Sequence, residues 1–192
     1  MNIKILQKFI RFTFFISIVI VVVGLLLPQQ YQVSKSVKIN AKATEIAPYI
    51  SDFGRWQIWS PWEKLDPSIK FHIAEPSSGV GAHQFWQSQW GAGEMTITSI
   101  SESTIKFNIL FNDEHIASGI ISFFEQQTYT RVVCEITAEV TTSLVGGYLA
   151  LLNQYILTNT VELGLNNLKT TMQLHIIDNE SHDDSQSSSS KN

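Results

Sequence analysis

An apolar run near the N-terminus is the strongest feature of the hydrophobic pattern. Residues 9–27 read FIRFTFFISIVIVVVGLLL and carry a single charge, on Arg11. As a helix this run would be about 28 Å long, close to the roughly 30 Å of a bilayer's hydrocarbon core. Pro28 then ends the helix, because proline has no N–H to donate. The pattern predicts a transmembrane anchor over residues 9–28.

Two other interpretations of this run fit less well. A core helix of a soluble domain would show a polar stripe, and the run has only Thr13 and Ser17. A cleaved signal peptide needs small residues at its cleavage site, but Gly24 lies inside the apolar run and the first alanine is Ala41. We therefore favour an uncleaved anchor.

The charges on either side of the run favour one orientation. Three basic residues precede or open the apolar run, whereas the first one after it is Lys35. Because positively charged flanks stay on the cytoplasmic side, residues 1–8 are expected in the cytoplasm and the remainder outside. The expected localisation is a bacterial inner membrane, with the domain on the periplasmic side.

Residues 29–177 carry the pattern of one α+β domain. Apolar and polar positions alternate over residues 32–39, which predicts a strand. Thr44 is a plausible N-cap for a helix over residues 45–53, which Gly54 would end. The period-two pattern then continues to Val140 with short turns, which favours an antiparallel meander. Its candidate strands cover residues 71–74, 82–89, 94–101, 104–112, 115–125 and 128–140.

The C-terminal part returns to helical spacing. A long helix is predicted from Leu144 to Met172, with Gly164 inside it at a cost of about 1 kcal/mol relative to alanine. Such a glycine indicates close packing at that point. The apolar stripe comprises Tyr148, Leu151, Leu152, Tyr155, Leu165, Leu168 and Met172. Residues 178–192 are rich in Ser and Asp and are predicted to be a disordered polar tail.

Composition excludes several classes of protein. The net charge is −4 and no basic patch with interleaved aromatics occurs, so we expect no nucleic-acid partner. Cys134 is the single cysteine, which excludes an internal disulfide. No Cys/His cluster has metal-ligand spacing, and no glycine-rich phosphate loop occurs, so we expect neither a metal nor a cofactor.

Several segments of the chain form a recognisable set. They are the anchor ending in Leu27-Pro28, Ile39-Asn40-Ala41, the helix 45–53, the run WQIWSPWEKLDP over 56–67, Gly79–Ala82, Trp86, Gly93–Ile97 and ELGLNNLK over 162–169. Together they resemble membrane-anchored members of the START-like superfamily, also labelled polyketide cyclase/dehydrase or SRPBCC proteins. Residues 87–92 depart from the family pattern and add Trp90. The resemblance implies a helix-grip fold, an antiparallel sheet around a long C-terminal helix with an apolar cavity between them.

The walls of such a cavity follow from the alternation of the strands and the stripe of the helix. The expected lining residues are Met95, Ile97, Phe107, Ile109, Phe111, Cys134 and Ile136 from the strands, and Tyr148, Leu152 and Tyr155 from the helix. A filled core would show the same periodicity, so both interpretations remain open. Trp56, Trp59, Trp62 and Trp86 either line the cavity mouth, rest at the lipid interface, or form a packed corner clamped by Ser60-Pro61, which we favour slightly.

Three functions are compatible with this pattern. The first is a membrane-anchored, non-catalytic carrier or sensor of an apolar small molecule or lipid. The second is an enzyme of polyketide cyclase/dehydrase type, as the resemblance implies, working in the same cavity. The third is a protein-interaction module with a filled core and a partner that the sequence does not identify. Catalysis is the less favoured, because the polar candidates show no convergent motif; these are His83, Gln84, Glu94, Asp113, His115 and Glu125.

Overall fold

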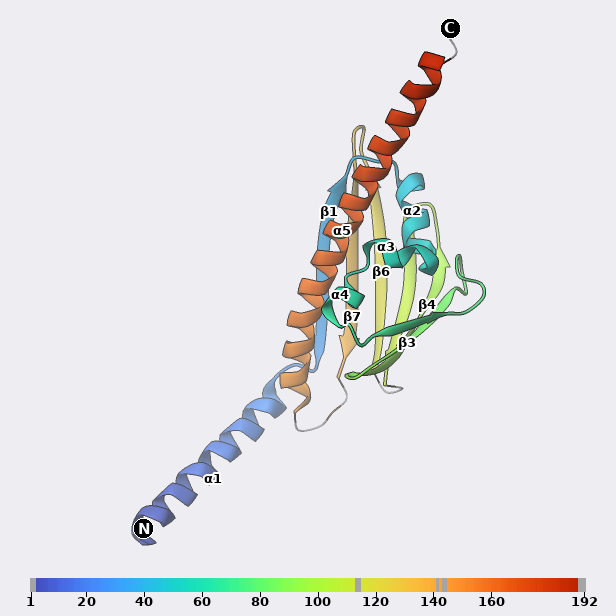
Figure 1. Ribbon diagram of the computed structural model, residues 1–192. Coiled ribbons are helices and arrows are strands. Elements are labelled where there is room, and N and C mark those ends of the chain that lie inside the picture. The colour runs from blue at the N-terminus through green and yellow to red at the C-terminus, as the bar shows by residue number, and fades with distance from the viewer. Residues whose placement is uncertain (1–2, 113–114, 141, 143–144, 190–192) are drawn as a thin grey trace.

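The computed structural model describes residues 3–112, 115–140, 142 and 145–189 (Figure 1). The helices are α1 (Ile3–Leu26), α2 (Ala43–Ser51), α3 (Trp56–Trp59), α4 (Trp62–Leu65) and α5 (Gly146–Ser189), with a 3-10 turn over Phe53–Arg55. The strands are β1 (Gln30–Ile39), β2 (Lys70–Ile73), β3 (His83–Ser88), β4 (Gly91–Ile100), β5 (Thr104–Phe111), β6 (His115–Glu125) and β7 (Thr130–Glu139). The predicted strand, helix, strands and long helix all occur in this order.

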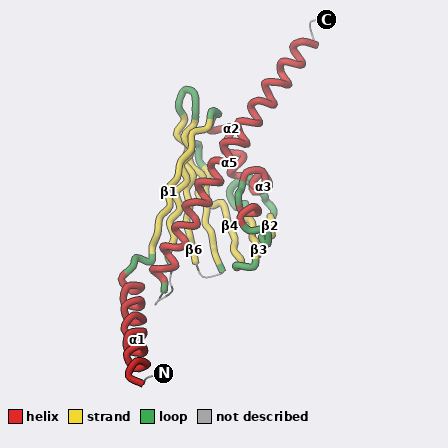
Figure 2. The backbone as a smooth tube through the Cα atoms, turned by 60° about the vertical axis from the view of Figure 1, so that its left-hand side comes forward, coloured by secondary structure: helices red, strands yellow, loops and turns green. Residues whose placement is uncertain are grey.

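The strands form one antiparallel seven-stranded sheet in the order β1-β7-β6-β5-β4-β3-β2. The sheet curves, and α5 crosses its concave face close to β1 (Figures 1 and 2). Polar contacts fix α5 to this edge strand: Gln154 Nε2 donates to the Gln32 carbonyl at 3.0 Å, and Lys35 pairs with Glu162. The fold is therefore the expected α+β helix-grip.

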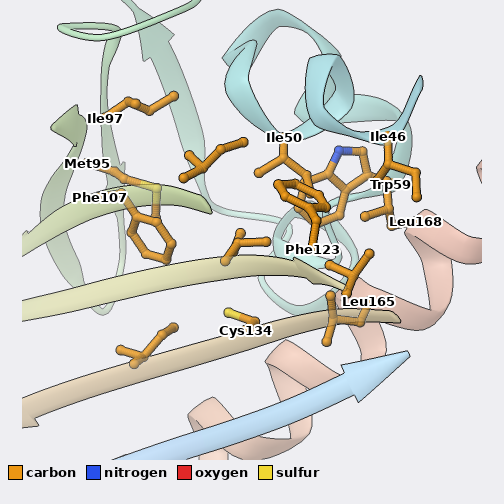
Figure 3. Packing of buried hydrophobic residues seen from close by; sticks show 14 of the residues in the cluster. Ile46, Ile50, Trp59, Met95, Ile97, Phe107, Phe123, Cys134, Leu165 and Leu168 are labelled. Atoms are coloured by element: carbon orange, nitrogen blue, oxygen red, sulfur yellow. The ribbon is translucent and has the colours of Figure 1, made fainter. Parts of the chain in front are cut away.

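One part of the core lies where α2 and α3 meet α5. Ile46, Ile50 and Trp59 point toward Phe123 of β6 and Leu168 of α5 (Figure 3). All five are buried, because these short helices close the concave side of the sheet at this end. Their apolar surface supplies much of the driving force for folding.

The start of α2 differs from the prediction. Thr44 is not the N-cap, because the helix begins at Ala43 and Lys42 precedes it. Two carboxylates accept hydrogen bonds from the free amides there: Glu45 Oε2 from the Lys42 amide at 2.8 Å, and Glu125 Oε2 from the Ala43 amide at 2.9 Å. Negative charge at a helix N-terminus satisfies these donors as well as a capping hydroxyl does.

The predicted start of the long helix, Leu144, lies outside the described residues. Gly164 differs from the expectation: close packing does not require a glycine there, since an added Cβ would meet Pro61 Cδ at 3.4 Å, an ordinary contact. α5 continues to Ser189, where its end projects away from the sheet (Figure 1). A segment rich in Ser and Asp has little apolar surface to bury, so disorder of residues 178–192 in solution stays a prediction; residues 190–192 lie outside the described part of the chain.

α1 extends from the domain as a separate rod (Figure 2). It is long and apolar enough to cross a membrane, as predicted, although a signal sequence shares these properties. Gly24 is its buried residue. α1 meets the start of α5, where Tyr148 Oη donates to the Ile20 carbonyl at 2.9 Å.

Candidate functional site

A cavity of about 600 Å³ lies between the sheet, α5 and the segment that contains α3 and α4. Its floor is formed by inward-facing residues of β3, β4 and β5, and its roof by residues 155–160 of α5. The cavity opens to the outside. Its size falls within the range of about 300–1,000 Å³ that is typical of small-molecule sites.

Alternation along β3 supplies one wall. Gln84, Trp86 and Ser88 all line the cavity, whereas the intervening Phe85 is exposed on the outer face. The cross-strand partner of Gln84 is Met95, which lines the cavity as well. Strand periodicity therefore does position the wall residues, as expected.

Aromatic rings cover the wall without filling the space. Trp86 packs edge-on against Phe111, with ring centroids 5.6 Å apart, and lies 6.2 Å from the ring of Phe71. Its cross-strand neighbour is Gly93, where an added Cβ would lie 2.3 Å from Trp86 Cζ2. The indole lies flat on the strand because Gly93 has no side chain, and the space above it stays open.

The other side of the cavity comes from short helices and α5. Trp56 of α3, with Trp62 and Leu65 of α4, faces Tyr155 and Thr160 of α5 across the opening. The Trp56 indole is fixed by its Nε1–H, which donates to the Ile50 carbonyl at 2.9 Å. The hydroxyl of Thr160 donates to the Ile156 carbonyl at 2.9 Å, so this buried roof residue is paired within α5.

Gln84 is the buried polar group in this wall. It is 3 % exposed, and no hydrogen bond to its side-chain amide is found within the described part of the chain. It also borders a small void of about 20 Å³, next to Ser60, whose buried hydroxyl has no partner among the described residues either. The Gln84 amide borders the open cavity, where its N–H and carbonyl groups can pair with whatever occupies the space.

The mouth carries a single carboxylate, Asp66, among the described lining residues. Hydrogen bonds from Ser68 lower the pKa of Asp66, the hydroxyl being 2.6 Å and the amide 2.9 Å from Oδ1. The residue is partly exposed to solvent, and its carboxylate is therefore anionic at neutral pH. No group of three metal-ligating side chains occurs among the described residues.

Seven of the predicted site residues line the cavity. They are Trp56, Trp62, Trp86, Met95, Ile109, Phe111 and Tyr155. They come together because the cavity lies between β3, β4 and β5, the short helices α3 and α4, and the N-terminal third of α5. Whether they contact a ligand stays a prediction.

The other seven lie elsewhere, which corrects the expected outline of the cavity. Ile97, Phe107, Cys134 and Ile136 are buried in the packed part of the core, and the ring of Phe107 rests on Gly119. Trp59 is a packed corner, its Nε1–H donating to the Tyr49 carbonyl at 2.9 Å. Tyr148 contacts α1 and Leu152 is 53 % exposed. Alternation identifies an inward face but not which part of that face is filled.

Sequence reasoning missed part of the lining. Leu65, Ile69, Phe71 and Ile156 carry no signal that separates them from ordinary core residues. Trp90 did carry one, since it lies in the segment that departs from the family pattern. It is 79 % exposed and lines the opening.

Of the polar residues considered for catalysis that the structure describes, Gln84 lines the cavity, whereas His83, Glu94 and Glu125 do not. His83 lies on the outer face of β3, with Nδ1 2.9 Å from Thr96 Oγ1 and Nε2 3.6 Å from Glu94 Oε2. Glu125 accepts from the start of α2. Asp113 lies outside the described residues, as does the side chain of His115.

Comparison with known proteins places the fold. Norcoclaurine synthase from Thalictrum flavum, solved with dopamine and hydroxybenzaldehyde, matches with a TM-score of 0.56 at 11 % identity, over 80 % of this chain and 92 % of that one. TTHA0849 from Thermus thermophilus matches with a TM-score of 0.55 at 18 % identity, over 76 % of this chain and 99 % of that one. Ms6760 from Mycobacterium smegmatis matches with a TM-score of 0.53 at 16 % identity, over 75 % of this chain and 92 % of that one. No family model and no curated protein matches the sequence.

At these identities the matches show the fold alone. They confirm the predicted architecture at that level, an antiparallel sheet around a long C-terminal helix. Fold and cavity define the class: a helix-grip domain with an open, largely apolar cavity, preceded by one apolar helix.

Proposed function

We propose that this protein is a carrier or sensor that binds an apolar small molecule or a lipid and is held at a membrane by α1. The observation that carries the proposal is the cavity of about 600 Å³, walled by aromatic residues around the buried amide of Gln84. A cavity of this kind is the usual form of a small-molecule site. The proposed location is the periplasmic side of a bacterial inner membrane.

The lining selects the chemistry of the ligand. Flat indole and phenyl faces favour rings, polyenes or acyl chains. The Gln84 amide both donates and accepts, so it suits a hydroxyl, carbonyl or amide group on the ligand. The anionic Asp66 at the mouth disfavours a second negative charge nearby. The expected ligand is thus neutral or cationic, with one polar group that enters first.

Non-catalytic binding is the better supported use of the cavity. Asp66, the one carboxylate among the described lining residues, lies at the mouth and is hydrogen-bonded to Ser68. General acid–base catalysis needs such a group aimed at the reacting atom. We therefore do not extend the proposal to a reaction of polyketide cyclase/dehydrase type.

The test is to identify what the full chain carries. The protein is purified in lipid nanodiscs, and the retained small molecules are measured by mass spectrometry, in the native protein and in two variants. Ile109→Trp fills the cavity from β5, whereas Ile120→Trp adds the same bulk to the outer face, where Ile120 pairs with Lys106 and Glu135.

A defined apolar species should be retained by the native protein and by Ile120→Trp, and lost from Ile109→Trp. Equal retention by both variants would place binding outside the cavity. If no species above the lipid background is found with the native protein, the proposal fails.

A further inference from the structure

One end of the domain exposes a set of large apolar side chains. They are Trp90, Val145, Leu149, Leu152, Tyr155 and Ile156, each between 37 % and 79 % exposed, and we call them the apolar end. Trp90 lies at the tip of the β3–β4 hairpin, and the others belong to the first turns of α5 and the residue before it. No charged residue occurs from 146 to 156 or from 87 to 93.

This end of the sheet is the one next to α1. The register links Gln30, the first residue of β1, to Glu139 of β7, and then Ala138 of β7 to Ala117 of β6. It continues from Phe111 of β5 to Gly93 of β4. The β3–β4 hairpin therefore lies at the same end of the strands as the start of β1, where the chain leaves α1 (Figures 1 and 2).

The connection between α1 and the domain is too short to hold the domain away from a membrane. Residues 27–29 join α1 to β1, a span of at most about 14 Å. Gly147 packs closely on α1, since an added Cβ would lie 2.3 Å from Leu27 Cβ and 2.9 Å from the Gly24 carbonyl.

Tyr148 reaches further along α1. Its hydroxyl bonds the carbonyl of Ile20, which lies about 9 Å before the end of the helix at Leu26. If α1 spans a bilayer to Leu26, the first turn of α5 lies at the depth of the lipid headgroups or below.

We propose that the apolar end is embedded in the bilayer surface and that the cavity opens onto lipid, so that the ligand enters from the membrane. Trp90, Tyr155 and Ile156 both line the cavity and belong to the apolar end, so the mouth and the docking surface are the same residues. Trp and Tyr are the side chains that favour the membrane interface. The inference rests on the proposed membrane anchoring by α1.

Two spin-labelled variants of the full chain test this arrangement in vesicles of phosphatidylethanolamine and phosphatidylglycerol. Gln89→Cys carries a label beside Trp90, and Gln127→Cys carries one on the exposed β6–β7 hairpin at the opposite end. Cys134 stays unlabelled, because it is buried and its thiol pKa is raised to about 12. Power saturation compares collisions of each label with oxygen, which concentrates in lipid, and with a water-soluble nickel complex.

The label at residue 89 should show an oxygen-to-nickel ratio several-fold above that of the label at 127. Adding Trp90→Ser should lower the ratio at 89 at least twofold. Adding Ile58→Ser should leave it unchanged, because Ile58 is a comparably exposed apolar residue but belongs to α3.

Three results would overturn the proposal. Equal nickel access at both positions, in protein that stays in the membrane after alkaline washing, would mean that the anchor holds but the domain stands clear of lipid. Shielding of residue 89 from both reagents would mean that a second copy or another protein covers this end. Protein released by the alkaline wash would refute the anchoring itself, and with it this inference.

Discussion

Trp86 of β3 lies directly across from Gly93 of β4, and its indole covers the space that a side chain at position 93 would occupy. The cavity exists in part because of this pairing. With any larger residue at position 93 the ring would be pushed away from the strand, into the open space. One missing side chain thus keeps a large aromatic residue in the wall of the site.

Gly93→Ala should therefore both destabilise the protein and weaken ligand retention. The new Cβ would lie 2.3 Å from Trp86 Cζ2 and 2.7 Å from the Leu110 carbonyl, and overpacking of this kind costs about 1–3 kcal/mol. The control is Gly119→Ala, which makes a similar clash with Phe107 at 2.1 Å in the packed core. Denaturant unfolding should show comparable losses for both variants, whereas retention falls in Gly93→Ala alone. Equal retention in the two would contradict the role given to Trp86.

Gln84→Leu should separate stability from binding. Exchanging this cavity-facing amide for an apolar side chain of similar size should change the free energy of unfolding of the empty protein by less than about 1 kcal/mol. Losing one hydrogen bond to the ligand should lower affinity about tenfold, which corresponds to about 1.4 kcal/mol. Gln87→Leu, on the exposed side of β3, is the control for both measurements. If Gln84→Leu binds the ligand as tightly as the native protein does, the Gln84 amide does not form a hydrogen bond with the ligand.

Cys134 should make the protein less stable in alkali. Burial raises the pKa of its thiol from about 9 to about 12, with a smaller contribution from Glu135. The folded state therefore favours the neutral thiol. This stabilisation is complete below pH 9 and is lost, by about 1.4 kcal/mol per pH unit, as pH rises from 9 toward 12.

The comparison with Cys134→Ala isolates the thiol, because burial also raises the pKa of the Tyr31 hydroxyl and acts in the same direction. Urea unfolding between pH 8.5 and about 10.5 should show a steeper fall for the native protein than for the variant. Parallel curves would mean that the thiol is accessible to solvent in the folded state.

Gly164→Ala should stabilise the protein by about 0.5–1 kcal/mol, since α5 gains a better helix former. The added Cβ would make ordinary contacts, 3.4 Å to Pro61 Cδ and 3.6 Å to Trp59 Cζ3. Gly147→Ala is the matched change in the same helix, and it should destabilise the contact with α1 because Leu27 is in the way. Thermal unfolding of the full chain in nanodiscs measures both. A loss of stability in Gly164→Ala would show that close packing does require this glycine.

Local patterns were sufficient to predict the order and type of the elements. The period-two alternation placed β5 and β6 within a residue of their ends, because alternation reports directly which side chains face the core. The start of α2 was misplaced, and one of the two carboxylates that accept from its free amides, Glu125, lies far away in the sequence. A distant capping group leaves no trace in the local pattern.

The sequence by itself determined that a curved sheet packs on a long apolar helix and that an apolar helix precedes the domain, because periodicity and length encode these features. Only the tertiary structure decided where the core is hollow. Phe107 and Phe111 share one face of β5, yet Phe107 rests on Gly119 in a filled layer while Phe111 borders the cavity. The difference depends on how far α5 and the short helices stand from each strand, and spacing along one chain segment does not record that distance.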